Sequence, residues 1–293
     1  MKTNAKPYGW IPLFSYCTRN PKILQANCQA CYSVMCDIGV CMRENDIKVA
    51  LLLEPYAREG RVVGVPDDMR VYMSADDCGA AVLIDDRGMD AVEISVEGQI
   101  LGVCVNIDCE LGSMCVVSVH CPFGYEIGPY LEWIRKVLGQ CEGKTMKDAN
   151  AVSPLWYSKY VSTGRESERR DRELEELIGE LDLEVLSRPS DLFTFSGPMG
   201  ESDIDVTVVN GGWLERFVCD TWEVKEDCSV SDHNCILIGV ESVRGKFNQK
   251  IKKRRGWFMG NVNWEMFKSE SYCCSKEPSV MLALYLCGLQ LRF

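Results

Sequence analysis

The sequence turns from polar to apolar at Ser231-Asp232-His233-Asn234-Cys235-Ile236-Leu237-Ile238-Gly239-Val240. A short apolar run that follows a turn-like stretch is typical of a buried strand. An acid and an imidazole stand directly before this run, so the beginning of the strand holds His233 in a fixed position. We therefore expect a strand over residues 235–240, with a polar site where it begins.

Working outward, other short apolar runs predict further strands, and several neighbouring ones are joined by turns such as Asp85-Asp86-Arg87-Gly88 and Glu97-Gly98. The predicted strands are 48–53, 70–73, 80–84, 91–96, 100–107, 115–119, 204–209 and 235–240. Apolar stripes predict one helix from Pro129, one from Glu166 and one over 25–44. These elements predict an α/β fold in which two packed mixed sheets are flanked by helices, a four-layer sandwich.

Polar residues that suit metal-assisted hydrolysis close or follow the apolar runs. Leu51-Leu52-Leu53-Glu54-Pro55 ends a strand on a carboxylate, and Asp148-Ala149-Asn150 sets an acid and an amide two residues apart. Carboxylate and carbonyl oxygens are the ligands of Mg²⁺ or Mn²⁺, which leave room for waters and substrate. Each stretch alone is also compatible with a solvated strand end or a turn, so the prediction depends on their combination.

The chain has two histidines, His120 and His233, and both lie inside such polar stretches. A hydrogen-bonded structural imidazole is the alternative to a catalytic one. Cutting a phosphodiester requires that the anion be neutralised, a water be aimed and the leaving oxygen be stabilised. Acid, amide and imidazole side chains in this order supply those three functions.

Seven stretches, read in order, resemble one family. They are Leu24-Gln25-Ala26-Asn27, Leu53-Glu54-Pro55-Tyr56, Ser118-Val119-His120-Cys121-Pro122, Asp148-Ala149-Asn150-Ala151-Val152-Ser153-Pro154-Leu155-Trp156, Phe193-Thr194-Phe195-Ser196-Gly197, Ser202-Asp203-Ile204-Asp205-Val206-Thr207 and Ser231-Asp232-His233-Asn234. The combination resembles the apurinic/apyrimidinic-type endonuclease domain of insect non-LTR retrotransposons. That family belongs to the endonuclease/exonuclease/phosphatase superfamily, and the resemblance runs from about Leu24 to Val240.

The resemblance implies a role for each matching residue. Asn27, Glu54 and Asp232 would form the site for Mg²⁺ or Mn²⁺. The catalytic residues would be Asp148 for the attacking water or leaving oxygen, Asn150 and His120 for the scissile phosphate, His233 for the transition state, and Asp205 to orient His233. Thr194 and Ser202 would contact phosphate or DNA.

The implied reaction is the nicking of one DNA strand to a 3'-hydroxyl and a 5'-phosphate, as in target-primed reverse transcription. DNA would be the partner, with no membrane and no nucleotide cofactor. The element's RNA and reverse transcriptase would be partners only where the full element is present.

Two departures from the family pattern keep alternatives open. His120 stands where the family usually has tyrosine, and residues 139–147 lack the apolar strand that delivers Asp148 and Asn150 in the family. The chain is therefore also compatible with a catalytically inert, folded retroelement remnant. A superfamily phosphatase or RNase is a further alternative.

Composition predicts a soluble folded chain of 293 residues, 46% hydrophobic and 26% charged. We expect an N-terminal lead segment over 1–22, the endonuclease domain over 23–242, and a basic linker with a poorly ordered tail over 243–293. Residues 1–10 lack the apolar core of a signal peptide, which predicts the nucleus or cytoplasm rather than secretion. Seventeen cysteines without such a signal favour free thiols, and zinc at Cys28, Cys31, Cys36 and Cys41 is the alternative.

A net charge of -11 argues against a general nucleic-acid binder, whose footprint is usually basic. A nuclease tolerates this charge if its acidic residues face away from DNA and bound metal offsets the carboxylates of the cleft. The basic run over 244–255 has three readings: phosphate contacts, a nuclear import signal, or a solvated linker.

Overall fold

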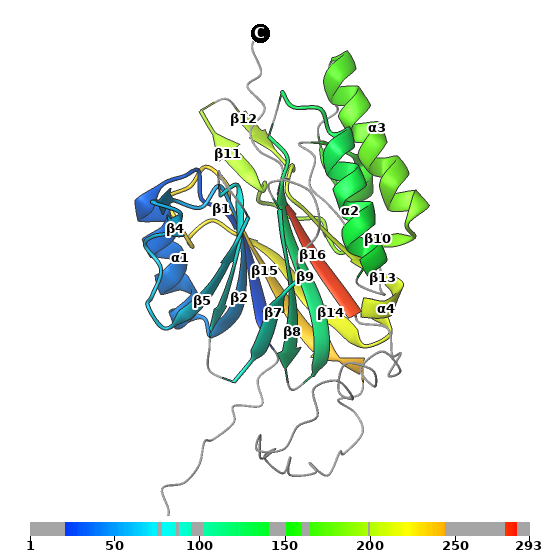
Figure 1. Cartoon of the computed structure of the whole chain (residues 1–293). Helices are drawn as coiled ribbons and strands as arrows, with labels where there is room; N and C mark the ends of the chain where they lie inside the picture. Colours follow the sequence, from blue (N-terminus) through cyan, green and yellow to red (C-terminus); the bar gives the residue numbers. More distant parts are fainter. Residues whose placement is uncertain are drawn as a thin grey trace, which may run out of the picture.

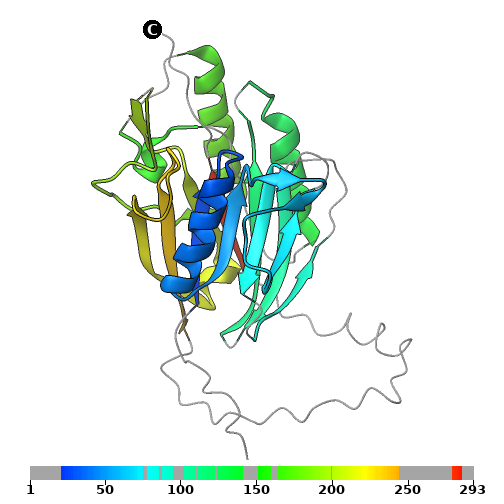
Figure 2. The ribbon, with the colours of Figure 1, turned by 90° about the vertical axis from the view of Figure 1, so that its left-hand side faces the viewer.

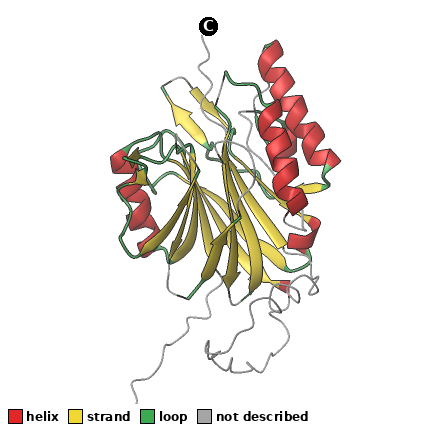
Figure 3. Ribbon diagram, in the orientation of Figure 1, coloured by secondary structure: helices red, strands yellow, loops and turns green. Residues whose placement is uncertain are grey.

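The two large sheets pack face to face, with helices on both outer sides (Figures 1 and 3). The computed structural model describes residues 21–74, 78–85, 88–94, 102–109, 111–122, 124–140, 151–159, 164–198, 200–243 and 279–285. The first sheet has the order β14-β15-β1-β2-β6-β5, and the second has the order β10-β13-β16-β9-β8-β7. This arrangement confirms the predicted four-layer α/β sandwich.

The strands of the first sheet are β1 Lys22–Asn27, β2 Ile47–Leu53, β5 Met69–Met73, β6 Ala80–Asp85, β14 Phe217–Lys225 and β15 Cys235–Ser242. Those of the second are β7 Asp90–Glu93, β8 Gly102–Cys109, β9 Gly112–His120, β10 Leu183–Val185, β13 Val206–Asn210 and β16 Ser279–Tyr285. Two small hairpins are β3 Ala57–Arg58 with β4 Arg61–Val62, and β11 Phe195–Gly197 with β12 Gly200–Ser202. The helices are α1 Tyr32–Glu44, α2 Gly128–Gln140, α3 Arg165–Glu180, the short α4 Gly211–Leu214 and the 3-10 turn η1 Pro154–Trp156.

Alternation along β8 explains why the second sheet is covered on both faces. Val103, Val105 and Ile107 are buried in the core shared with the first sheet and α1, whereas Cys104 is buried against α2 and α3. Successive side chains of a strand point to opposite faces, so one strand contributes to both layers. The helices α2 and α3 therefore form the outer layer on this side, and α1 forms the layer on the other side (Figure 2).

The sequence predicts a helix over residues 25–44, and this is wrong for residues 25–27, which end β1. The side chain of Gln25 is buried because it has partners on the second sheet: its Nε2 donates to the Val206 carbonyl at 3.3 Å, and its Oε1 accepts from Thr207 Oγ1 at 2.9 Å. Helix α1 then links β1 to the parallel strand β2. Its predicted apolar side is confirmed, since Val34, Ile38 and Cys41 are all buried.

The strand β16 lies in the middle of the second sheet, parallel to β9 and antiparallel to β13. Its register runs from Ser279 beside Met114 to Tyr285 beside His120. The sequence predicts a domain that ends at residue 242 and places residues 279–285 in the tail. In the structure these residues form a strand of the domain. Without β16, neither β9 nor β13 would have a partner on that side.

Gly102, at the start of β8, offers a stability test of the packing between the second sheet and α2. A Cβ at Gly102 would lie 2.7 Å from the Trp133 ring, which is buried in α2. We expect Gly102→Ala to lower the free energy of unfolding by about 1–3 kcal/mol through overpacking. A Cβ at Gly179 in α3 would meet no atom within 4 Å, so Gly179→Ala should instead stabilise by roughly 0.5–1 kcal/mol. Urea unfolding followed by circular dichroism measures both, and equal effects would contradict the packing at Gly102.

Among the helices that the structure describes, none is long and apolar enough to cross a membrane.

Candidate active site

Five strand ends meet at one edge of the two sheets and bring the polar residues together. β1 ends at Asn27, β2 ends just before Glu54, and β9 ends at His120. The strand β15 begins at the same edge because it is antiparallel to β1, which ends there. The strand β13 also begins there, because it is antiparallel to β16, which runs parallel to β9. Asp205 precedes β13 and His233 stands two residues before β15. The structure thus gathers residues that the sequence spreads over most of the chain.

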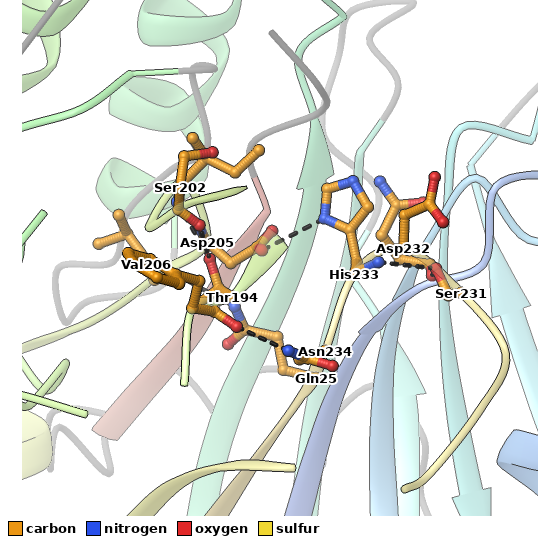
Figure 4. Close-up of polar contacts among 12 residues, drawn as sticks. Gln25, Thr194, Ser202, Asp205, Val206, Ser231, Asp232, His233 and Asn234 are labelled. Carbon is orange, nitrogen blue, oxygen red and sulfur yellow. Dashed lines mark hydrogen bonds and ion pairs between the residues drawn. The ribbon is translucent and has the colours of Figure 1, made fainter. Parts of the chain in front are cut away.

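A buried imidazole and a buried carboxylate form the centre of this site (Figure 4). His233 Nδ1 lies 3.2 Å from Asp205 Oδ2, and the two side chains are 1% and 0% exposed. The His233 and Phe195 rings also meet in a T-shaped arrangement, with 5.0 Å between ring centroids. A carboxylate at Nδ1 fixes the tautomer and the orientation of the ring. This is the pairing that the resemblance implies for these two residues.

The segment before β13 is held by Thr194. Its Oγ1 accepts from the backbone N–H groups of Ile204 at 3.0 Å and Asp205 at 3.1 Å, and it lies 3.5 Å from the Ser202 carbonyl. Thr194 is buried, and Ser202, in β12, is 9% exposed. In this structure Thr194 positions Asp205, and a direct contact of Thr194 or Ser202 with DNA stays a prediction.

The segment that carries His233 is held by residues to which the sequence alone assigns no role. Ser231 Oγ donates to the Asn27 carbonyl at 2.9 Å and accepts from the His233 N–H at 3.1 Å. Gln29 Oε1 accepts from the Asp232 N–H at 3.2 Å. The position of Ser231 at the start of the stretch Ser231-Asp232-His233-Asn234 could have indicated its supporting role. Nothing in the sequence marks Gln29, because its partner lies 203 residues away.

Asn27 and Glu54, which the resemblance implies for a metal site, contact each other directly. Asn27 Nδ2 donates to Glu54 Oε1 at 3.2 Å, and Glu54 has a left-handed φ of 43°. That conformation is uncommon for a residue other than glycine, and it is held here because the Glu54 N–H donates to the Gly79 carbonyl at 2.9 Å. Figure 4 shows the His233 ring between Asp205 on one side and Asp232 on the other.

Two carboxylates and an amide, Glu54, Asp232 and Asn27, are hard oxygen donors of the type that suits Mg²⁺ or Mn²⁺. The described residues contain no group of three His, Cys, Asp or Glu side chains arranged to hold a metal ion. A metal site that relies on one or two protein carboxylates and on water fits both the presence of these donors and the absence of such a group, since Mg²⁺ usually keeps several of its waters.

His120 lies at the end of β9, next to Glu54. Its Nε2 is 3.4 Å from Glu54 Oε1, and the side chain is buried. Burial lowers the pKa of the His120 imidazole below its ordinary value, the Glu54 carboxylate opposes this, and His233 and Arg170 add to the lowering. The buried Arg170 guanidinium supports the turn after β9 by donating to the Cys121 carbonyl at 3.2 Å. The structure therefore brings His120 to the predicted site.

Asp148 and Asn150 lie outside the described residues, so their predicted roles stay predictions. The described chain resumes at Ala151 and Val152, both of which are buried. The Val152 N–H donates to Asp171 in α3 at 2.8 Å.

The comparisons with known proteins point to the endonucleases of retroelements. Residues 114–237 match the family model described as endonuclease-reverse transcriptase. The chain is 44% identical over 192 residues to the retrovirus-related Pol polyprotein from type-1 retrotransposable element R1 of Bradysia coprophila, which covers 62% of the chain and 19% of that protein. It is 31% identical over 253 residues to the putative 115 kDa protein in type-1 retrotransposable element R1DM of Drosophila melanogaster, covering 84% of the chain and 24% of that protein. The chain thus spans about a quarter or less of the length of these relatives.

Among solved structures, the endonuclease domain of TRAS1, a telomere-specific non-LTR retrotransposon, aligns with a TM-score of 0.64 and 27% identity. The alignment covers 75% of this chain and 98% of that domain, so the two share one fold over nearly the whole of it. The family match, the two relatives and this fold agree with one another. The chain is thus similar to the endonuclease domains of non-LTR retrotransposons and has the endonuclease/exonuclease/phosphatase fold.

Proposed function

We propose that this chain is a metal-dependent DNA endonuclease that nicks one strand by hydrolysis and leaves a 3'-hydroxyl and a 5'-phosphate. The observation that carries the proposal is the buried His233–Asp205 pair, 3.2 Å apart, beside a set of hard oxygen donors. Such an arrangement suits a substrate that is an anion and passes through a more highly charged transition state.

In the proposed mechanism, His233 acts on the scissile phosphate. The Asp205 carboxylate accepts a hydrogen bond from Nδ1 and so keeps the opposite ring nitrogen, Nε2, aimed away from Asp205. When the ring is protonated, Nε2 donates to a phosphate oxygen and stabilises the negative charge of the transition state. Because both side chains are buried, this interaction is screened less by water than it would be on the surface.

Glu54 is the principal residue proposed to hold Mg²⁺ or Mn²⁺, with Asn27 and Asp232 beside it. When bound, such an ion neutralises phosphate charge and lowers the pKa of water. Asn27 already orients Glu54 through its amide, so the carboxylate is set in place by the protein. Asp148 is proposed to handle the proton of the attacking water or leaving oxygen, and Asn150 to hold the phosphate, as the resemblance implies.

The test is nicking of supercoiled plasmid by the purified chain with Mg²⁺, Mn²⁺ or EDTA. We expect open-circular product with either metal and none with EDTA. Extension of the nick by a DNA polymerase would identify the 3'-hydroxyl, and nicks that ligase seals would identify the 5'-phosphate. A folded protein that fails to nick the plasmid with either Mg²⁺ or Mn²⁺ would be identified as an inert remnant. Cleavage of RNA or a phosphomonoester in place of DNA would identify a change of substrate.

Glu54→Ala should raise the Mg²⁺ concentration needed for half-maximal nicking by at least about tenfold, because a ligand has been removed. Glu44→Ala is the matched control. That residue is an exposed glutamate at the far end of α1, so its loss should leave the metal titration unchanged. Superposable metal titrations for Glu54→Ala and the parent chain would remove Glu54 from the metal site.

A further inference from the structure

Two thiols from distant parts of the chain meet beside α1. The Cys41 S–H, on α1, donates to Cys228 Sγ with 3.0 Å between the sulfurs, although the two residues lie 187 positions apart in the sequence. Cys228 belongs to the segment between β14 and β15 that leads to His233, and both thiols are free. A disulfide has about 2.05 Å between its sulfurs, so an approach of about 1 Å would bring these two to bonding distance.

The pair lies beside a cavity of about 540 Å³, which both Cys41 and Cys228 line. Other walls of this cavity come from α1, with Val40 and Glu44, and from Val230 in the segment that follows Cys228. Cys228 is partly exposed, whereas Cys41 is 7% exposed. A small reagent in the cavity therefore meets Cys228 first and finds Cys41 directly behind it.

Access distinguishes this pair from another close pair of thiols in the chain. Cys104 Sγ and Cys115 Sγ lie 3.1 Å apart, but the two residues are 1% and 0% exposed in the core between the second sheet, α2 and α3. A reagent cannot reach that pair without local unfolding. Of the two pairs, only Cys41 and Cys228 combine close sulfurs with a route for a reagent.

The surroundings of the pair determine which thiol reacts first. A hydrogen bond with Cys235 raises the pKa of the Cys228 thiol to about 12, the hydrogen bond from Cys41 opposes this rise, and burial adds to it. The pKa of the Cys41 thiol is also raised, chiefly by its hydrogen bond to Cys228. Both thiols are therefore protonated near neutral pH, and their exchange with a disulfide is slow. Cys228 is the better nucleophile, because the Cys41 S–H donates to its thiolate.

The charge of the cavity walls favours one kind of reagent. Three carboxylates line the cavity, those of Asp37, Glu44 and Asp227. Its lysine, Lys225, is paired with Glu223 at 2.7 Å. Walls of this charge attract a cation and repel an anion.

We propose that Cys41 and Cys228 form a reversible disulfide by exchange with a small, positively charged disulfide that enters this cavity. The Cys228 thiolate attacks one sulfur of the reagent, whose S–S bond breaks and releases one thiol as it takes up a proton. Cys41 then loses its proton and attacks the Cys228 sulfur, which forms the protein disulfide and releases the second thiol. The two protein thiols are oxidised, and the reagent is reduced to two thiols that carry the two protons.

The new bond would tie α1 to the segment that carries the active-site histidine. That segment is already anchored at Ser231, whose Oγ donates to the Asn27 carbonyl at 2.9 Å. A crosslink between residues 187 positions apart removes much of the freedom of the unfolded chain. We therefore expect the melting temperature of the oxidised chain to rise by about 5–10 °C.

The test uses the full chain and cystamine, a disulfide with an ammonium group at each end. After incubation, free thiols are alkylated and the chain is digested with trypsin without reductant. We expect a crosslink between peptides 23–43 and 226–244, which contain Cys41 and Cys228, and its loss on addition of dithiothreitol. The rise in melting temperature should be reversed by the same treatment. Neither readout requires nicking, so the result is independent of the proposed endonuclease function.

Three variants identify the pair. Cys41→Ser and Cys228→Ser should each abolish the crosslink and the rise in melting temperature. Cys36→Ser is the matched control, because Cys36 lies on the same helix but does not line the cavity, and it should retain both effects. Should Cys41→Ser fail to fold, Cys228→Ser decides the question.

The preference for a cation is tested with oxidised glutathione, a disulfide of net negative charge. The ratio of the initial rates of crosslinking with cystamine and with oxidised glutathione should fall by at least about twofold in Asp227→Asn. An unchanged ratio would overturn the preference for a positively charged reagent.

Other outcomes would overturn the pair itself. These are the absence of any crosslink, a crosslink that survives in both Cys41→Ser and Cys228→Ser, or a disulfide from Cys228 to Cys235 in its place. Oxidation of Cys104 and Cys115 at the same rate would overturn the role of the cavity.

Discussion

Replacing His233 with alanine should reduce plasmid nicking by at least about a hundredfold while the protein stays folded. The imidazole is held by Asp205 at 3.2 Å and packs against the Phe195 ring, and its loss removes the group that we propose stabilises the transition state. Initial rates of open-circle formation, measured at saturating Mg²⁺, are the readout. Circular dichroism and a thermal melt of the same preparation establish that the fold is retained.

Two further variants separate chemistry from packing at His233. Asp205→Asn keeps the shape of the carboxyl group but weakens its hold on Nδ1, so nicking should fall by about tenfold or more. Arg43→Ala removes an exposed side chain that pairs with Asp68 near the far end of α1, and it should nick at the parent rate. If His233→Ala nicks as fast as the parent chain, the catalytic centre lies elsewhere.

Ending the chain at residue 270, which removes β16, should lower the free energy of unfolding by at least about 5 kcal/mol. The strand pairs with β9 along its whole length and with β13 from Met281 to Leu284. Its removal would leave backbone N–H and C=O groups of both neighbours without partners inside the sandwich. We therefore expect loss of the cooperative urea transition, and loss of nicking with it, because His120 and Asp205 lie at the ends of the two neighbouring strands.

The matched control is a chain ending at residue 285, which loses only the residues that follow β16. It should unfold at the same urea concentration as the parent chain. A synthetic peptide with the sequence of residues 279–285, added to the chain that ends at 270, should restore part of the transition. An unchanged urea midpoint in the shorter chain would mean that β9 and β13 close against each other without β16.

The fold could be predicted where a single run of sequence determines an element. The runs 48–53 and 235–240 are buried on the sheet at the predicted places, as β2 and β15. The apolar stripe of Leu174, Leu177 and Ile178 is buried on α3, as its spacing predicts. The strand β14 was not predicted, because its exposed positions alternate with buried ones in a segment that contains several charged residues. Its register depends on pairing with β15, which no local pattern specifies.

The residues of the site, like the elements of the fold, could be predicted only where a local stretch of sequence marks them. Motif residues such as Glu54 and His233 were found because they stand at the ends of apolar runs. Gln25 and Gln29 were missed because each is fixed by a partner far away in the sequence: Thr207 for the first and Asp232 for the second. Their functions as supports depend on tertiary contacts, and a polar residue in a strand or turn does not reveal its partner.

The middle position of β16 also sets the order of events during synthesis. β9 and β13 leave the ribosome long before residues 279–285, yet the sheet that contains them is not complete until those residues arrive. Until then both strands expose an unpaired edge, and such edges readily pair with other chains. Folding of this domain must therefore finish late, and pairing between residues so distant in sequence is slow. Yield from a cell-free synthesis should accordingly depend on chaperones more than it would for a domain whose sheets close in chain order.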